Sequence, residues 1–146
     1  MRALVQRVSR ACVRVAAPAP GGEPETIARI GAGLLVLLGV APSDGEQAAD
    51  RLAERIRALR IFADAAGAMN DALGDREILC VSQFTLYADT RHGNRPGFGG
   101  AAPPELAEPL YERVCERLGA ARGCFGAHME IELTADGPVT ILLEVT

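Results

Sequence analysis

The sequence predicts a single-domain α/β protein in which a curved, mixed or mostly antiparallel β-sheet forms a barrel-like core packed with two main helices. Three observations predict this class. A length of 146 residues suits one domain. Several segments alternate apolar and polar residues as strands do, and two longer segments repeat apolar residues at helical spacing. With 49% hydrophobic and 23% charged residues, the composition is that of a globular chain and not of a disordered or fibrous one.

The first part of the chain has the pattern of three strands. Residues 2–15 alternate apolar and polar positions with a slip near Ser9, which is typical of a long strand containing a β-bulge. A turn at residues 18–22, built from Pro, Ala and Gly, joins it to a returning strand at residues 25–30. Residues 34–40 are a continuous apolar run, which predicts a strand covered on both faces.

Two segments predict helices. Ser43 and Glu46 have the spacing of a capping box, in which the two side chains close the first turn of a helix. Beyond them, apolar residues recur on one face with charges opposite, namely Ala49, Leu52, Ala53, Ile56 and Leu59. A second helix is predicted at about residues 104–118, ended by Gly119, with Pro109 in its first turns or kinking it.

The rest of the chain predicts three more strands. A central strand covers residues 77–86, and the Gly- and Pro-rich segment 87–104 should be irregular. Two final strands, at residues 129–133 and 139–145, are predicted to be joined by a turn at Asp136-Gly137-Pro138.

Charge and hydropathy exclude two classes of protein. A formal net charge of −4 does not suit a protein that coats nucleic acid by bulk electrostatics, so a nucleic-acid contact would be a local patch. The longest apolar stretch, residues 31–40, is too short to span a bilayer. The alternating N-terminal segment lacks the uninterrupted apolar run of a signal peptide. We therefore expect a cytoplasmic protein with no membrane partner.

Cysteines and histidines give no sign of a metal site. The chain has four cysteines with neither a CxxC pair nor a histidine at ligand spacing, namely Cys12, Cys80, Cys115 and Cys124. We expect free buried thiols in a reducing compartment. His92 and His128 are isolated in the sequence, and His128 is expected to be a hydrogen-bonded structural histidine. No metal and no cofactor are expected.

Candidate nucleophiles gather around the end of the predicted central strand, namely Cys80, Ser82 and Thr85. A cysteine or serine hydrolase needs a base within hydrogen-bond reach and a third group that orients the base. Nothing in the sequence places His92 beside these residues, so a buried thiol and strand hydroxyls are the favoured interpretation. The basic loop 91–96 has the guanidinium groups to hold one or two phosphates, although a solvated surface loop explains the same residues.

Four stretches resemble the D-aminoacyl-tRNA deacylase family, namely VSQFTLYADTR (Val81–Arg91), GNRPGF (Gly93–Phe98), FGAHM (Phe125–Met129) and DGPVT (Asp136–Thr140). The opening MRALVQRVSRA and the run GAGLLVLLGV fit as well, so the resemblance covers residues 1–146 as one domain. There are three departures. Gly97 stands where a serine is usual, Ala135 replaces a usual asparagine, and the connection 118–125 is short.

The resemblance implies a homodimeric editing hydrolase that cleaves the ester of D-aminoacyl-tRNA to free tRNA and amino acid. tRNA is then the partner, and neither DNA nor a cofactor is expected. The 2′-hydroxyl of the tRNA would assist the attack. Gly137 and Pro138, joined in the family by a cis peptide, would enter the partner subunit's pocket and reject L-amino acids. Because glycine has no side chain to reject, glycyl-tRNA should also be hydrolysed, including glycine misattached to alanine tRNA.

The resemblance also implies roles for individual residues. Positioning of the ester and backbone donors would come from Ser82, Gln83, Phe84 and Thr85. The substrate pocket would be closed by Phe125, Gly126, Ala127 and Met129, and tRNA would be contacted by Arg91, Arg95 and Pro96. Two alternatives stay open: a protein-nucleophile hydrolase that uses Cys80, Ser82 or Thr85, and a non-catalytic module that binds the tRNA end.

Overall fold

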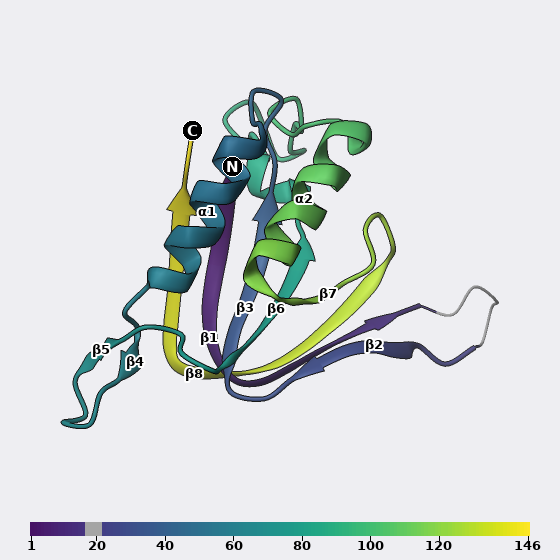
Figure 1. The fold of residues 1–146 in the computed structure, drawn as a ribbon. Helices are drawn as coiled ribbons and strands as arrows, with labels where there is room; N and C mark the ends of the chain where they lie inside the picture. The colour runs from purple at the N-terminus through teal and green to yellow at the C-terminus, as the bar shows by residue number, and fades with distance from the viewer. Residues whose placement is uncertain (17–21) are drawn as a thin grey trace.

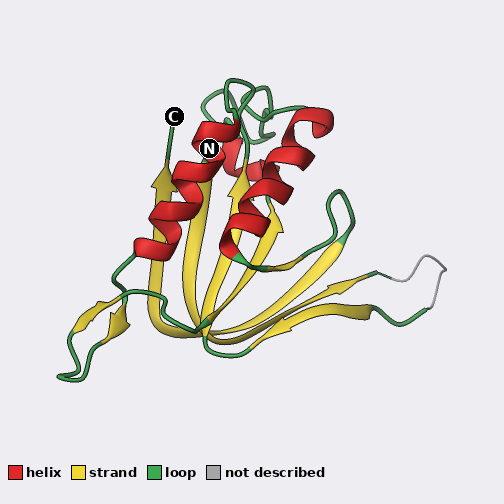
Figure 2. Ribbon diagram, viewed as in Figure 1, coloured by secondary structure: helices red, strands yellow, loops and turns green. Residues whose placement is uncertain are grey.

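The structure, a computed structural model, describes residues 1–16 and 22–146 and confirms the predicted class (Figures 1 and 2). The strands are β1 (Arg2–Val15), β2 (Glu25–Ile30), β3 (Gly33–Gly39), β4 (Phe62–Ala63), β5 (Met69–Asp71), β6 (Glu77–Ser82), β7 (Ala121–Arg122) and β8 (Met129–Glu144). The helices are α1 (Glu46–Ala58), α2 (Pro104–Leu118) and a short 3₁₀ helix, η1 (Phe84–Tyr87). The turn predicted at 18–22 lies almost wholly outside the described residues.

The sheet is built around β1, which is paired along both of its edges. One edge pairs antiparallel with β8 over the whole strand, and the other pairs antiparallel first with β3 and then with β2. β6 adds to β3 in parallel, and β7 adds to β6 in parallel. The bulge predicted near Ser9 is confirmed, because the β1–β8 register shifts between Val8 and Arg10. Past this point the strands curl away from the helices (Figure 1).

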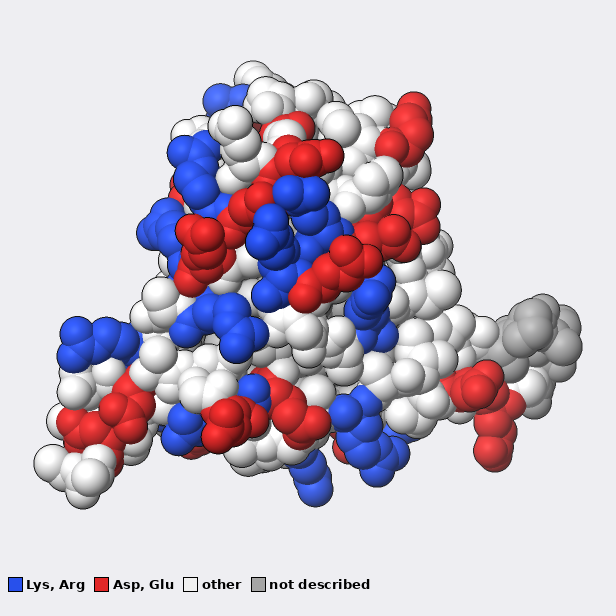
Figure 3. Space-filling view, in the orientation of Figure 1, with Lys and Arg blue, Asp and Glu red and all other residues white. Residues whose placement is uncertain are grey.

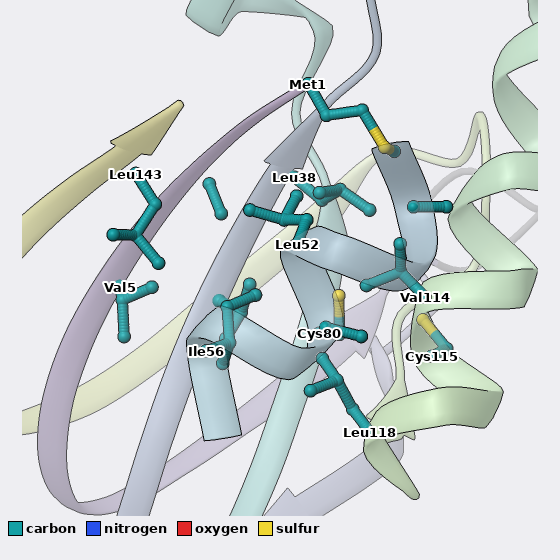
Figure 4. Packing of buried hydrophobic residues seen from close by; sticks show 14 of the residues in the cluster. Met1, Val5, Leu38, Leu52, Ile56, Cys80, Val114, Cys115, Leu118 and Leu143 are labelled. Carbon is teal, nitrogen blue, oxygen red and sulfur yellow. The ribbon is translucent and has the colours of Figure 1, made fainter. Parts of the chain in front are cut away.

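The curved sheet buries apolar side chains on both faces, as the run 34–40 predicted. On the helix side, Leu38 of β3 belongs to one cluster with Leu52 and Ile56 of α1 (Figure 4). On the opposite side, Leu35 of β3 and Leu79 of β6 pack with the second half of β1. Because each face of β3 covers a separate core, alternation of apolar and polar residues is absent from this strand.

Helix α2 has the predicted bounds, and Pro109 lies inside it. Asp50 of α1 joins the two helices, because Arg113 and Arg117 of α2 both donate to its carboxylate, at 2.8 and 3.1 Å from their Nε atoms. These hydrogen bonds hold the pKa of Asp50 below its ordinary value. Acidic and basic side chains interleave over this helical face (Figure 3). None of the described helices is long and apolar enough to cross a lipid bilayer.

The predicted capping box is wrong. Gly45 takes the N-cap position and Glu46 is the first helical residue, whereas a capping box needs its glutamate at the third. Asp44 fixes this approach to the helix, because its carboxylate accepts hydrogen bonds from the Ala41 N–H and from the amino group of Met1, both at 2.7 Å. Glu46 instead reaches Arg113 of α2 at 3.2 Å.

The central strand predicted to run to residue 86 ends at Ser82. Gln83 still donates its N–H to the Leu38 carbonyl at 2.7 Å, and the chain then turns into η1. This turn lies directly on Gly39, where an added Cβ would meet the Gln83 oxygen and two side-chain carbons at 3.2 Å each. Because Gly39 has no side chain, η1 can pack directly against its backbone.

The two predicted final strands are one strand, β8. Both of its halves pair with β1 in the same direction, so the chain does not reverse at Gly137-Pro138. Residues 136–139 form a bulge between the pairs Val8–Ala135 and Gln6–Thr140. A turn signal that usually separates two strands here interrupts the pairing of a single strand.

The four cysteines are free, and the expectation that they are buried holds for two of them. Cys80 and Cys115 lie in the core between β6 and α2, where Figure 4 shows both. Cys12 is half-buried and Cys124 is exposed. A hydrogen bond with Cys115, together with burial, raises the pKa of the Cys80 thiol. Since the thiolate is the reactive form, Cys80 should be inert in the folded protein.

Titration with Ellman's reagent should distinguish these thiols. In the native protein we expect Cys124 to react first and Cys12 more slowly, with Cys80 and Cys115 reacting only after unfolding in guanidinium chloride. The Cys124→Ser variant is the control that should abolish the fast phase. Reaction of all four thiols at one rate under native conditions would contradict the buried placement.

Candidate functional site

A cavity of about 560 Å³ opens beside the end of β6. Its walls come from β3, β6, η1, the segment after residue 97, the start of α2, and residues 125–131, which lead into β8 and form its start. Seven of the predicted site residues line it together, namely Ser82, Gln83, Phe84, Phe125, Gly126, Ala127 and Met129. Thr85 does not line it, and neither do Arg91, Arg95, Pro96, Gly137 and Pro138.

Parallel pairing of β6 with β7 explains why two distant segments share this cavity. Leu79 is paired with Ala121 and Cys80 with Arg122, so the chain leaves both strands at the same end of the sheet. Gly123 continues this pairing by donating its N–H to the Cys80 carbonyl at 3.0 Å. The carboxyl ends of parallel strands are a common place for ligand sites, because the loops that follow them converge there.

Aromatic rings give the cavity a wide apolar surface. The rings of Phe84 and Phe98 meet edge to face with their centroids 5.0 Å apart. Both are unusually open for large apolar side chains, at 53% and 40% exposed. On another side, Phe125 lies against Tyr111, with 5.8 Å between centroids. Exposed rings at the edge of a cavity are suited to stacking on a planar group such as a nucleobase.

Few polar side chains face this cavity. Ser82 and Gln83 line it, and the Gln83 amide donates to the Thr85 hydroxyl, which fixes the glutamine beside η1. Sequence reasoning missed the contributions of Phe98 and His128, although both lie inside quoted stretches, GNRPGF and FGAHM. The sequence alone does not show which of these stretches lie close together in the folded chain.

The expectation of a structural His128 is wrong. Its backbone carbonyl accepts a hydrogen bond from the Ala16 N–H at 3.2 Å, but its side chain is exposed and lines the cavity. The residue belongs to the segment entering β8, where side chains alternate between the enclosed cluster and solvent. Met129 packs against that cluster, so the side chain of the neighbouring His128 is on the opposite, exposed side of the chain, where the cavity opens.

The geometry does not supply an activated nucleophile. Cys80 is fully buried on the helix side of β6 and is not among the cavity residues, which removes it from the alternative of a protein nucleophile. Among the described residues, no histidine is hydrogen-bonded to Ser82 or Thr85. The two hydroxyls therefore lack the base that a serine- or threonine-type hydrolase uses.

The basic loop is closed at its base and adjoins the cavity. Asp89 and Gly97 exchange two backbone hydrogen bonds of 2.8 Å, and Phe98 follows directly at the cavity edge. Within the loop, Arg91 donates to both carboxylate oxygens of Asp89, at 2.9 and 2.7 Å. These bonds lower the pKa of Asp89 and leave Arg91 already paired. Arg95 is exposed, so it is the better placed of the two arginines to meet a phosphate.

Gly137 and Pro138 lie far from the cavity of their own chain. They belong to the bulge of β8, six residues further along the strand than Ile131, whereas β8 lines the cavity with its first residues, Met129 and Ile131. The peptide bond between them is cis, which is the geometry that the resemblance implies. Arg7 of β1 holds the bulge by donating its Nε–H to the Asp136 carbonyl at 3.0 Å. At Gly137, with φ of +138°, an added Cβ would come within 2.7 Å of the Val139 nitrogen.

Comparisons with known proteins support the resemblance of these segments to the deacylase family. The family model described as D-Tyr-tRNA(Tyr) deacylase matches residues 4–144. The D-aminoacyl-tRNA deacylase of Anaeromyxobacter dehalogenans is 55% identical, over 99% of this chain and 97% of the relative. The protein of the same name from Limosilactobacillus reuteri is 46% identical, over 99% of each chain.

Two solved structures share the fold. One, described as c-Myc DNA Unwinding Element Binding Protein, superposes with a TM-score of 0.87 at 41% identity, covering 99% of this chain and 98% of that one. The other, described as a probable eukaryotic D-amino acid tRNA deacylase, has a TM-score of 0.80 over 97% of each chain. At 15% identity, this second likeness concerns the fold alone. Since the family model spans nearly the whole sequence and full-length relatives are about half identical, the chain belongs to the D-Tyr-tRNA(Tyr) deacylase family.

Proposed function

We propose that this protein hydrolyses the ester between a D-amino acid and the terminal adenosine of tRNA, releasing free tRNA and the D-amino acid in the cytoplasm. The observation that carries the proposal is the meeting of residues 82–84 and 125–129, which resemble two family signatures, in one cavity of about 560 Å³. Cavities of roughly 300–1,000 Å³ are usual for small-molecule sites, and an aminoacyl-adenosine is of that size class. The open rings of Phe84 and Phe98 suit stacking on adenine.

The proposed chemistry takes its assistance from the substrate. A water molecule attacks the ester carbonyl with help from the vicinal ribose 2′-hydroxyl, and the bond from the carbonyl carbon to the ribose oxygen breaks. The ribose oxygen takes a proton, and the amino acid leaves as its free acid. The protein positions the ester, which can contribute about 7–11 kcal/mol when the reacting atoms are held at attack geometry. A backbone donor to the oxyanion, for which we propose the N–H of Phe84 or Thr85, adds about 3 kcal/mol.

We propose that Gly137 and Pro138 reject L-amino acids in the cavity of a partner subunit. Their bulge is exposed and lies further along β8 than the residues with which that strand lines the cavity of the same chain. Further along the same strand, Leu142 is a large apolar side chain that is 52% exposed. An exposed leucine on the strand that carries the bulge supports a homodimer in which each subunit completes the other's site.

We do not propose double-stranded DNA as a partner, although one similar structure is described as c-Myc DNA Unwinding Element Binding Protein. The chain has a net charge of −4, and Arg91 of the basic loop is already paired with Asp89. Contact with a single tRNA end needs only a local basic group, for which we propose Arg95, with Pro96 beside it. A non-catalytic module that binds the tRNA end remains the alternative, and binding without deacylation would support it.

The oligomeric state tests the shared site. Sedimentation equilibrium should give a mass of twice the 15.3 kDa chain at concentrations where the enzyme is active. A single-chain mass in a fully active preparation would exclude a site completed by a second subunit.

A single-turnover comparison of D-alanyl-, glycyl- and L-alanyl-tRNA on one tRNA body tests activity and chirality together. We expect the D-alanyl ester to be cleaved and the L-alanyl ester to resist. Glycine lacks only a methyl group relative to D-alanine, a difference of about 1–3 kcal/mol, so glycyl-tRNA should be cleaved at most about 200-fold more slowly. Glycine carried on alanine tRNA would then be a substrate.

The possible outcomes separate three ideas. No hydrolysis of the D-alanyl ester would refute the proposed activity. Glycyl-tRNA as resistant as the L-alanyl ester would mean that the cavity recognises the D side chain positively, and rejection by Gly137 and Pro138 would have to be abandoned. An Arg7→Met variant that loses discrimination while keeping D-alanyl hydrolysis would support rejection by the bulge that Arg7 holds.

Substitution of the hydroxyls and the thiol tests the source of the nucleophile. Ser82→Ala, Thr85→Ala and Cys80→Ala should each retain measurable hydrolysis, because none of these residues has a base beside it. A substrate that ends in 2′-deoxyadenosine, with the ester on the 3′-oxygen, should be nearly inert. If one correctly folded alanine variant were dead and the deoxy substrate were cleaved normally, a protein nucleophile would be established instead.

A further inference from the structure

We infer that Arg2 is a positioning residue for the proposed reaction, because it holds η1, the turn that carries Phe84 and Thr85. The inference rests on the proposed function. Arg2 is at the start of β1 and does not line the cavity, so it acts only through η1. Its Nη1 donates to the Leu86 carbonyl at 2.9 Å, and its guanidinium carbon lies 4.6 Å from the centre of the Tyr87 ring.

The other polar restraints on the turn lie at its start, where the Gln83 N–H donates to the Leu38 carbonyl and the Gln83 amide donates to the Thr85 hydroxyl. The turn is four residues long, and Phe84 lines the cavity. Short 3₁₀ segments have poor internal hydrogen-bond geometry and depend on their surroundings. Below the turn is the bare backbone of Gly39, which fits closely but donates no side-chain bond. Arg2 therefore supplies the side-chain hydrogen bond at the end of η1 that lies away from Phe84.

The guanidinium is itself held in place. Its Nε lies 2.5 Å from a carboxylate oxygen of Glu144 on β8, so Arg2 links the end of β8 to η1 across β1. Burial, together with the nearby Asp44 carboxylate, raises the pKa of Tyr87 to about 12. The phenol therefore stays neutral well above physiological pH, and its ring face attracts the guanidinium of Arg2.

Displacement of η1 should affect the reaction more than binding. If the Phe84 or Thr85 N–H stabilises charge that develops only in the transition state, a shift of the turn lowers the catalytic rate and leaves ground-state affinity nearly unchanged. A misplacement of about 1 Å can cost roughly 100-fold in rate. Loss of Arg2 should therefore appear in kcat and not in KM.

The experiment compares Arg2→Met and Arg2→Lys with Arg57→Met. Arg57 is a matched control, because its Nη1 also donates to a backbone carbonyl, that of Leu118 at 2.8 Å, which belongs to α2 and not to η1. For D-alanyl-tRNA we expect kcat of Arg2→Met to fall about 10- to 100-fold with KM within twofold. Arg2→Lys should recover part of the loss, and Arg57→Met should match the wild type.

Hydrogen exchange provides a readout that needs no activity. In Arg2→Met, amides of residues 83–88 should exchange at least about 10-fold faster, while those of α1 keep their wild-type rates. Faster exchange throughout the molecule would assign Arg2 a general stabilising role and overturn the inference, as would a kcat within twofold of wild type. An inactive wild type would refute the proposed function, and the exchange data would still decide whether Arg2 holds η1. If Arg2→Met fails to fold, Arg2→Lys must show the same local pattern in weaker form.

Discussion

The architecture depends on β1, a single strand that pairs with three other strands along its two edges. β1 faces β8 along one edge, while its other edge is divided between β3 and β2. At the division, near Ser9, the register with β8 shifts and the sheet has to bend. The bend encloses the second apolar cluster and brings Met129, at the start of β8, against Val81 of β6. The cavity opens at this junction, so its position follows from the pairing of β1.

The sequence pattern correctly predicted those helices and strands that depend on the periodicity of their own residues. The bulged first strand, the doubly buried run and both main helices follow from spacing alone. Errors arose where a distant backbone decides the outcome. The apolar sequence after Ser82 suits a strand, but the missing side chain of Gly39 admits a 3₁₀ turn there. The Gly137-Pro138 signal suggests a reversal, but β1 pairs with the chain on both sides of it.

The candidate site shows the same division between local and long-range information. The segments around Ser82 and Phe125 could be quoted from the sequence, and the parallel pairing of β6 with β7 decides that they meet. No spacing in the sequence reports that pairing, because β7 is only two residues long. The exposure of His128 at the cavity and the placement of Cys80 away from it could not be predicted from spacing either, since each depends on which parts of the chain pack together. Gly137 is kept from the cavity by its position along β8, beyond the residues with which that strand lines it.

Steric rejection of one enantiomer requires a backbone that cannot yield. A clash that relaxes at a cost of 1–2 kcal/mol discriminates only about 5- to 30-fold, so a proposed filter made of main chain needs firm support. The bulge at residues 136–139 has such support from Arg7, which binds the Asp136 carbonyl and also the Ile61 carbonyl. Arg7 and Arg2 are both side chains of β1, one holding the proposed filter and the other the proposed oxyanion donors. In a two-fold homodimer, the relative placement of filter and ester would then be set by how two copies of this strand are held against each other.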